Sequence, residues 1–553
     1  MKYRILALVI PVLMMLMPFS FAAPSAATTN WVTTATKPLD LTDAINLGSL
    51  SGSKTIQVVV SLNLQHQNEL KQYIADINTP GNALYGQSLT PSEFTARYGP
   101  SDQQVQKVTD YLQSKGLTVK NVASNHLLIS AAGTANEIES AFHTSINWFN
   151  QDDQKVFANT SSVQVPESLG DTVNAVLGLN SVARMSTPLK TASDADLLGT
   201  IEGLAAPNYP ASYTPKGFWK AYDVGDTPTG SGTNIAIFAA GNLDPVVKNL
   251  RAAEEANGLP KVPVTVVEMG SVGSAAVGAI EWDMDTQYAS GMAGDVSNLY
   301  LYDAPSLSNA DIAKSFNKFV SQNAAKAGSA SFGECGALAY LTGLMSTADQ
   351  IFEEAAAQGQ TIFASAGDTG GFCTVAPTNG VPAGIPDVEY PAASPYVTAV
   401  GGTTLFTNND GSYNNEIAWL AGGGAPSYFE PEPAWQQGVI LPSTGKGVPD
   451  ISMDADPNSG AVVYTSPSSK QTVGGTSLSS PLALGVWARL ETSHNNQLGF
   501  ASPRFYQVYQ SKGFHDIILG DNGPYPALPG WDFATGLGTV DVNQMDAVIA
   551  STK

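Results

Sequence analysis

Positive charge and histidine are both scarce in this chain of 553 residues. Lysine and arginine total 26 against 48 acidic residues, so the formal net charge is −22. A nucleic-acid partner is not expected, because its phosphates would be repelled. The acidic surplus fits plain solubility and an acidic working pH equally well. None of the five histidines lies in a motif suited to activating a serine, so serine chemistry would need another base.

Long apolar runs are missing beyond the first residues. The apolar run at 5–17 follows Lys2 and Arg4 and precedes the small-residue site Ser20-Phe21-Ala22. This order is typical of a secretory signal peptide, residues 1–22, and the run is too short to prefer a membrane span. No later stretch reaches span length, so we expect a secreted, extracellular protein without membrane contact once the signal is removed.

Cysteine is nearly absent. Cys335 and Cys373 are too far apart for the CxxC motif of redox and zinc sites. In an exported chain the even count favours one disulfide, and two buried thiols are the alternative.

The length predicts two or more domains, because a single core does not grow to this size. Residues 201–553 alternate apolar strand-like runs with helical patterns, which predicts a parallel sheet with helices on both faces. The expected strands are 235–240, 262–269, 299–302, 361–365, 397–400 and 461–464, and the expected helices are 245–257, 276–292, 309–327, 345–358 and 477–492. Residues 23–180 read as a smaller α+β unit, and 181–212 as a linker rich in Ala, Ser and Pro.

Ser477 is the first candidate for chemistry. It follows Gly474-Gly475-Thr476, and Pro481 fits an early helical turn. A serine at a helix N-terminus has backbone N–H groups and the positive end of the helix dipole nearby, which suits an anionic intermediate. A plain helix cap is the alternative and the commoner use of such a serine.

Glu281 and Asp285 form the second candidate. At positions i and i+4 of a helix both carboxylates lie on one face, where they can share a proton. A glutamate base suits an acidic pH as histidine suits neutrality. The alternative is a solvated acidic face, and Asp283, which points away from the pair, is expected at the surface.

Asp368 is the third candidate, in the glycine-flanked loop after the strand 361–365. A carboxylic acid at the end of a strand can donate a hydrogen bond to a developing oxyanion only while it is protonated. The alternative is an ordinary turn aspartate.

The order Glu/Asp, Asp, Ser resembles the sedolisin family of serine-carboxyl peptidases. Further strings carry the resemblance through most of the chain: Arg97-Tyr98-Gly99-Pro100, Tyr390-Pro391-Ala392-Ala393-Ser394-Pro395, Val400-Gly401-Gly402-Thr403, Gly422-Gly423-Gly424 and Val448-Pro449-Asp450. The resemblance implies an α/β, subtilisin-like parallel sheet over 213–553, preceded by a ferredoxin-like activation prosegment over 23–180.

The resemblance also implies a role for each candidate. Ser477 would be the nucleophile, Glu281 its base and later the general acid, and Asp285 the partner that orients Glu281. Asp368 would stabilise the oxyanion. The string Ser331-Phe332-Gly333-Glu334-Cys335 resembles the family's substrate-cleft strand, so a bridge from Cys335 to Cys373 would brace two walls of one cleft.

The segment 514–538 is similar to the family's calcium loop and implies one structural Ca²⁺. The implied ligands are the carboxylates of Asp516 and Asp532 and the carbonyls of Ile517 and Gly530, which suit the oxygen preference of calcium. Leu528 stands where family members often have glycine, and a positive φ would be costly there.

These observations predict a secreted, acid-acting endopeptidase that hydrolyses protein or peptide substrates through an acyl-enzyme. The prosegment would act as an intramolecular inhibitor until self-cleavage within 181–212, and the mature protein would be a monomer. At low pH, carboxylates paired with Lys107 or Arg97 would lose their charge, and this loss would release the prosegment. The alternatives are a tripeptidyl aminopeptidase on the same scaffold and an inactive secreted binding or inhibitory homologue.

Overall fold

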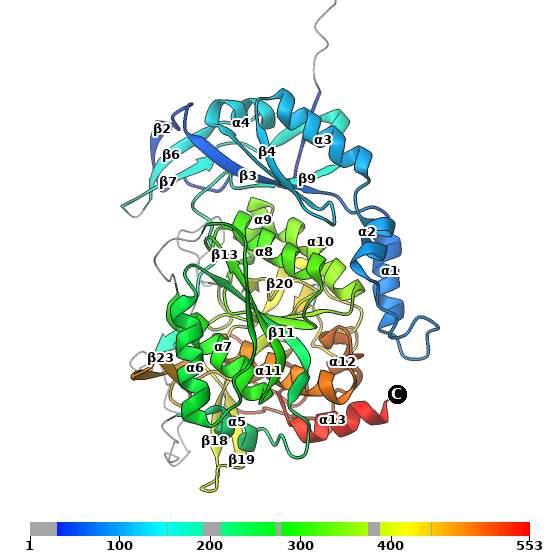
Figure 1. Ribbon diagram of the computed structural model, residues 1–553, viewed down its shortest axis with the longest axis vertical. Coiled ribbons are helices and arrows are strands. Elements are labelled where there is room, and N and C mark those ends of the chain that lie inside the picture. The colour runs from blue at the N-terminus through cyan, green and yellow to red at the C-terminus, as the bar shows by residue number, and fades with distance from the viewer. Residues whose placement is uncertain are drawn as a thin grey trace, which may run out of the picture.

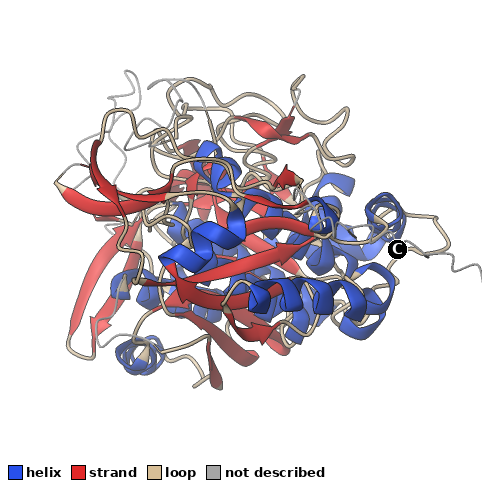
Figure 2. Ribbon diagram, turned by 90° about the horizontal axis from the view of Figure 1, so that it is seen from above, coloured by secondary structure: helices blue, strands red, loops and turns tan. Residues whose placement is uncertain are grey.

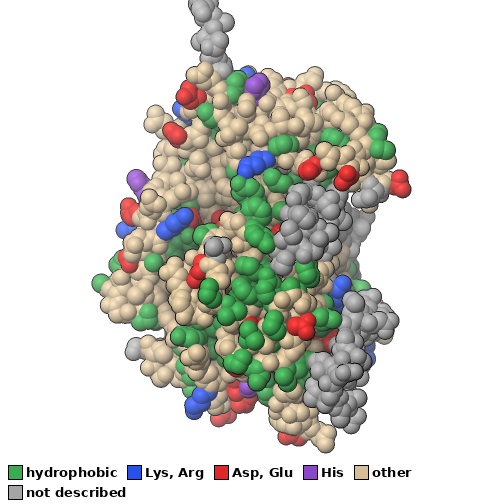
Figure 3. Space-filling model, turned by 180° about the vertical axis from the view of Figure 1, so that it is seen from behind, with side chains coloured by type: hydrophobic (Ala, Val, Ile, Leu, Met, Phe, Trp, Pro, Cys, Tyr) green, Lys and Arg blue, Asp and Glu red, His purple; other side chains and the backbone are tan. Residues whose placement is uncertain are grey.

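The computed structural model describes residues 30–151, 153–187, 189–191, 212–271, 278–373, 387–443 and 445–552. The expected signal peptide and residues 192–211 of the expected linker lie outside them. Figure 1 shows a smaller N-terminal unit stacked on a larger C-terminal one. Within the described residues, no helix has the length and apolar character that a membrane crossing needs. Lys and Arg are sparse on the face in Figure 3, in line with the net charge.

The larger unit is built on a ten-stranded sheet, in which eight neighbouring strands are parallel. Their runs are apolar because both faces of the sheet are covered. In spatial order they are β12 (Val264–Glu268), β13 (Val296–Ala304), β11 (Gly230–Ala240), β14 (Ala327–Ala330), β16 (Thr361–Ser365), β18 (Thr398–Thr407), β22 (Ile451–Asp454) and β26 (Thr539–Val540). Two antiparallel strands, β25 (Phe514–His515) and β19 (Tyr413–Ala418), complete the sheet.

Helices cover both faces of the sheet (Figure 2). α7 (Ala279–Ala293) and α11 (Thr476–Ser493) pack together on one face, with α6 (Asp244–Asn257) outside them. α8 (Asn309–Gln322) and α10 (Leu344–Ala357) pack together on the other. The remaining helices of this unit are α5 (Pro215–Ala221), α9 (Gly336–Thr342), α12 (Ala501–Gln507) and α13 (Val542–Ser551). The predicted subtilisin-like α/β architecture is therefore confirmed.

Two details of the predicted sheet are wrong. The strand expected at 461–464 is β23 (Ala461–Ser466), but it pairs outside the main sheet with β24 (Ser469–Gly474). The helix expected to run to residue 327 ends at Gln322, because Asn323 takes a left-handed conformation with φ 46°. The residues thereby released form β14, a strand of small residues that lacks the usual β-branched signal.

The N-terminal unit contains a four-stranded antiparallel sheet in the order β9 (Val173–Leu177), β3 (Thr55–Leu62), β5 (Leu128–Thr134), β4 (Thr118–Val122). α3 (Asp102–Ser114) and α4 (Ala135–Phe142) share one apolar cluster with one face of this sheet. This strand order with two helices is the predicted ferredoxin-like arrangement. The other strands are β1 (Trp31–Thr33), β2 (Ile45–Ser49), β6 (Ile146–Gln151), β7 (Gln154–Asn159) and β8 (Gln164–Pro166).

The other face of the same sheet packs on the larger unit. Along β3, Val58 and Val60 belong to the core of the N-terminal unit, whereas Val59 joins the core of the C-terminal one. This alternation follows from the two-residue period of a strand. α1 (Gln67–Ile77) lies against α10, and α2 (Pro91–Tyr98) against α8 (Figure 1).

Amide groups supply most polar contacts named across this interface. Gln350 Oε1 accepts a hydrogen bond from Leu64 N at 2.6 Å, and Asn125 Nδ2 donates to Asn317 and Glu354 at 2.7 Å each. An ion pair also crosses it, between Lys71 and Glu353 at 3.9 Å.

Lys107 and Arg97, expected to meet carboxylates of the larger unit, make their contacts inside the N-terminal one. Lys107 donates to the carbonyl of Ser168, and the Arg97 guanidinium lies 5.6 Å from the centre of the Tyr73 ring. The expectation that they carry the pH-dependent docking is therefore wrong.

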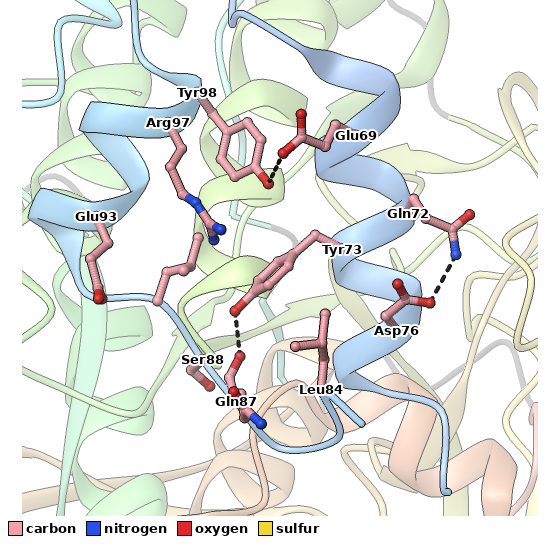
Figure 4. A pocket seen from close by; sticks show the side chains of 11 residues that line it. Glu69, Gln72, Tyr73, Asp76, Leu84, Gln87, Ser88, Glu93, Arg97 and Tyr98 are labelled. Atoms are coloured by element: carbon pink, nitrogen blue, oxygen red, sulfur yellow. Dashed lines mark hydrogen bonds between the residues drawn. The ribbon is translucent and has the colours of Figure 1, made fainter. Parts of the chain in front are cut away.

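A cavity of about 720 Å³ lies within the N-terminal unit between α1 and α2 (Figure 4). Tyr73 and Tyr98 project into it, and their hydroxyls donate to the carbonyl of Gln87 at 2.6 Å and to Glu69 at 3.4 Å. None of the predicted catalytic side chains lines it, so the site must be sought elsewhere.

Candidate active site

Ser477 occupies the first turn of α11, directly after β24. Gly475 caps this helix with φ 112°, a conformation that favours glycine. A Cβ atom at Gly475 would lie 2.4 Å from Oδ2 of Asp368, so a side chain there would displace the aspartate. The Gly-Gly pair therefore lets the N-terminus of α11 contact the Asp368 loop. Gly367 of this loop and Thr476 of the helix are 109 residues apart in the sequence and share a hydrogen bond.

Glu281 and Asp285 face the same point from α7. The side chains of Glu281, Asp285 and Ser477 are at most 1% exposed. Ser331 Oγ donates to Asp285 Oδ1 at 2.6 Å and to the carbonyl of Ser477 at 3.2 Å, so it ties the second carboxyl to the nucleophile's backbone. Ser477 Oγ is close enough to Glu281 to lower the pKa of that carboxyl, although the two do not reach standard hydrogen-bond geometry.

The two carboxyls behave as a pair. Burial raises the pKa of Glu281 well above its usual range, and the charge of Asp285 raises it further. Burial also raises the pKa of Asp285, against the lowering effect of the Ser331 hydroxyl. Two buried carboxyls without a cation between them favour a shared proton, and the pair titrates as one unit.

Asp368 lies on the other side of the nucleophile, in the loop after β16. Its Oδ1 accepts from the backbone N and the hydroxyl of Thr476 at 2.7 and 2.8 Å. Its Oδ2 is buried and has no hydrogen-bond partner among the described residues. Burial raises the pKa of Asp368 to about 7, so below neutral pH this free oxygen can carry a proton and donate it.

The structure brings the four predicted residues together, and a solvated acidic face is excluded. It also corrects the expectation for Asp283, which is buried on α7 and accepts from Asn249 Nδ2 at 3.1 Å. The surface expectation assumed a half-exposed helix. α7 is buried from Glu281 through Ala293, because it lies between α6 and α11.

The disulfide expected between Cys335 and Cys373 is present, with a Cα–Cα distance of 5.5 Å. Cys335 follows the 331–333 segment of the cleft, and Cys373 follows the Asp368 loop. The bridge thus connects the 331–335 segment to the end of the Asp368 loop.

Two parts of the linker pair with segments next to the site residues, which the sequence did not reveal. Ser186 and Gly333 exchange two backbone hydrogen bonds of 2.9 and 3.0 Å. Further on, β10 (Lys190–Thr191) pairs antiparallel with β24, with Lys190 opposite Gly474. Ser477 lies three residues after Gly474, so β10 pairs with the strand that leads directly into the helix of the nucleophile.

Three of the four predicted calcium residues make backbone-to-carboxylate contacts in the C-terminal loop. Gly530 N donates to both carboxylate oxygens of Asp516, at 3.2 and 3.0 Å. Leu528 N donates to Asp532 Oδ2 at 2.8 Å. Leu528 is not among the residues with positive φ, whereas Gly530 has φ 84°, so the strain expected at Leu528 is absent.

Both units of the chain match known protein families. The model of the pro-kumamolisin activation domain matches residues 42–182, and that of the subtilase family matches 271–512. Sedolisin of Pseudomonas sp. (strain 101) is 36% identical over 96% of this chain and 95% of its own length. The solved structure of Pseudomonas sedolisin complexed with pseudo-iodotyrostatin has a TM-score of 0.58 at 37% identity, covering 62% of this chain and 98% of that chain. Tripeptidyl-peptidase 1 of Rattus norvegicus is 23% identical over 90% of this chain and 92% of its own length.

The chain therefore belongs to the sedolisin family and is a serine-type peptidase with an activation domain. The alternative of an inactive binding or inhibitory homologue is not supported.

We predict that the precursor is more stable at pH 4.5 than at pH 8. Burial raises the pKa of Glu416 and Glu491 from 4.5 to about 7, and that of Asp368 from 3.8 to about 7. A carboxyl whose pKa is raised on folding stabilises the native state below its unfolded pKa, and this contribution is lost as pH rises through the folded pKa. A shift such as that of Glu416 corresponds to roughly 3 kcal/mol. Denaturant unfolding of the Ser477→Ala chain at both pH values measures the difference, and a larger unfolding free energy at pH 8 would contradict it.

Proposed function

We propose that this protein is a secreted, acid-acting serine-carboxyl endopeptidase made as a self-processing precursor. The observation that carries the proposal is the convergence of Ser477, Glu281, Asp285 and Asp368 without any imidazole. Three histidines lie in the N-terminal unit, His494 ends α11 and His515 belongs to β25. A carboxyl group is thus the base available to Ser477.

The chemistry is acyl transfer. Glu281 takes the proton of Ser477 Oγ as the oxygen attacks the peptide carbonyl, and then donates it to the leaving amine. Asp285 shares a proton with Glu281 and, held by Ser331, fixes its orientation. A water molecule, deprotonated by Glu281, then attacks the acyl-enzyme and releases the second product together with the free serine.

Asp368 supplies the oxyanion donor. With Oδ1 committed to Thr476, the unpartnered Oδ2 is the oxygen that would donate to the tetrahedral intermediate. It does so only while neutral, so a pKa of about 7 confines this role to acidic solution. The acidic working pH follows from this requirement.

The linker is the first substrate of the enzyme. The proposed division is a prosegment over 23–180, a linker over 181–212 and a catalytic domain over 213–553. The pairing of Ser186 with Gly333 and of Lys190 with Gly474 supports this, with Ser186 assigned to the acyl side and Thr191 to the leaving-group side. Met185 also lies in the cleft, where its backbone N donates to Leu307 O at 3.0 Å.

Endopeptidase action is favoured over removal of tripeptides. The linker chain continues through the cleft N-terminal to Ser186, and a site that admits only three residues would be closed there. The identity to sedolisin, 36%, also exceeds the 23% to the tripeptidyl-peptidase.

A structural calcium ion fits the C-terminal loop. The donor set consists of oxygen atoms alone, with Asp516 and Asp532 at opposite ends of the loop and the carbonyls of Ile517 and Gly530 between them. Both carboxylates already close this loop through backbone donors, so the residues are placed to hold the ion. Its contribution would be the stability of the loop, since Asp532 also fixes the turn at Thr535.

Ser477→Ala should abolish both self-processing and hydrolysis of a denatured protein, with a loss of at least about 10⁴-fold in kcat. Ser479→Ala is the matched control, because its hydroxyl donates to the carbonyls of Met453 and Asp454 in β22 and not to the catalytic carboxyls. Sequencing of the peptides released by the active enzyme should show scattered internal cuts. Three-residue products would replace the endopeptidase assignment with a tripeptidyl-peptidase.

The first processing cut is expected at one of the four peptide bonds between Ser186 and Lys190. Mass spectrometry of the fragments formed within the first minutes at pH 4 identifies this bond. Because the linker already lies in the cleft, the rate should not depend on protein concentration. A first cut within 192–211 would show that the bound segment is not the one cleaved.

Calcium should raise the thermal stability of the protein, by about 2.7 kcal/mol when the ion is at 100 times its Kd. Asp516→Asn should remove this response. Asp521→Asn, in the same loop but with its carboxylate bound to Gly523 N, should keep it. An equal calcium response in all three proteins would place the ion elsewhere.

A further inference from the structure

A carboxyl outside the catalytic group lies in the wall of the cleft. Glu389 begins β17 (Glu389–Tyr390), which pairs antiparallel with β15 (Glu334–Cys335). A Cβ atom at Gly333 would lie 2.4 Å from Glu389 Oε2, and one at Gly367 would lie 3.0 Å from its Cδ. The carboxyl is therefore held between the segment that binds the linker backbone and the residue that precedes Asp368.

These two glycines follow neighbouring strands of the main sheet. β14 and β16 are parallel and adjacent, with Ala330 opposite Ala364, and their extensions beyond the sheet carry Gly333 and Gly367. The carboxyl ends of such strands are where ligands bind in α/β sheets. A substrate residue whose carbonyl faces Asp368 would direct its side chain between these extensions, toward Glu389.

The Glu389 carboxyl lacks the partners that a structural carboxyl has. Glu389 is 9% exposed, and its Oε2 is buried without a hydrogen bond from any residue that the structure describes. The charged group that acts on it is another acid, Asp368, and burial raises its pKa to about 7. Leaving such a group unpaired costs free energy, so a ligand that donates a hydrogen bond to it is favoured.

Its neighbour on the same hairpin shows the contrast. Glu334 projects from the other side of β15 and accepts from Asn309 Nδ2 at 2.8 Å, at the start of α8. Glu334 thus has a side-chain partner for one of its two oxygens, and its other oxygen is buried without one.

We propose that Glu389 is a specificity-determining residue that selects lysine or arginine on the acyl side of the cleaved bond, at the position directly preceding it. The inference rests on the proposed function and adds the substrate class. In the precursor the linker brings Lys190 close enough to Asp368 to oppose the burial that raises the pKa of that carboxyl. A basic side chain of a substrate would reach Glu389 once the linker has left.

The test compares two peptides that differ only in lysine or norleucine at this position, at pH 6, with the processed enzyme. The wild-type ratio of kcat/KM for lysine over norleucine should exceed one and fall at least tenfold in Glu389→Gln, whose side chain keeps the shape but cannot release a proton to pair with the bound ammonium. Glu334→Gln is the matched control and should leave the ratio unchanged.

A second variant guards against misfolding of the first. Gly333→Ala forces the Glu389 carboxyl out of its present place, so it should also lower the ratio, while self-processing of either variant reports that the chain folds. An unchanged ratio in Glu389→Gln, or a wild-type preference for norleucine, would overturn the proposal. Failure of the wild-type enzyme to cut either peptide, with Ser477→Ala behaving identically, would instead overturn the proposed function.

Discussion

The catalytic arrangement depends on the close contact between α7 and α11. Gly485 makes this contact possible, since a Cβ atom there would lie 2.6 Å from Met292 Cβ and 2.7 Å from the carbonyl of Ala289. The two helices therefore approach with backbone against side chain, and Glu281 reaches the start of α11 where Ser477 lies. Water is excluded from this seam, and its exclusion keeps two carboxyls partly neutral and turns one of them into a usable base.

The same constraint explains why acidity recurs throughout the larger unit. A carboxyl proposed to work as a base or as a neutral donor needs an environment that disfavours its charge, which is the basis of the proposed acidic working pH. Glu334 and Glu354 illustrate how far this extends, because burial raises the pKa of each to about 8 although neither contacts the nucleophile. At low pH such groups are neutral hydrogen-bonding side chains, so the net charge of −22 applies only to neutral solution.

Apolar periodicity predicted the parallel sheet, and the three motifs together with the family resemblance that they carry predicted the four side chains that the structure brings together. Those features are local, or repeat along the chain. The missed features depend on tertiary contacts. Asp283 is buried because a second layer of helix covers α7, and β14 forms from small residues because β11 and β16 pair with it on both sides. The linker pairs with Gly333 and Gly474, which are far from it in the sequence, so no pattern within 181–191 could predict this pairing.

The contacts that hold the prosegment bear on how acid activates the precursor. Most polar groups named in that interface are amides, such as Gln350 and Asn125, whose charge does not change with pH. The buried carboxyl that Asn125 meets, Glu354, has a raised pKa, so its contribution to the interface is present at low pH and lost as pH rises toward 8. The ion pair between Lys71 and Glu353 has the opposite pH dependence. Its lysine is half exposed, however, and such pairs contribute little to stability. In the proposed mechanism, acidification therefore does not act mainly by loosening the prosegment. It would act at the catalytic centre, where protonation of Asp368 would supply the donor for the oxyanion.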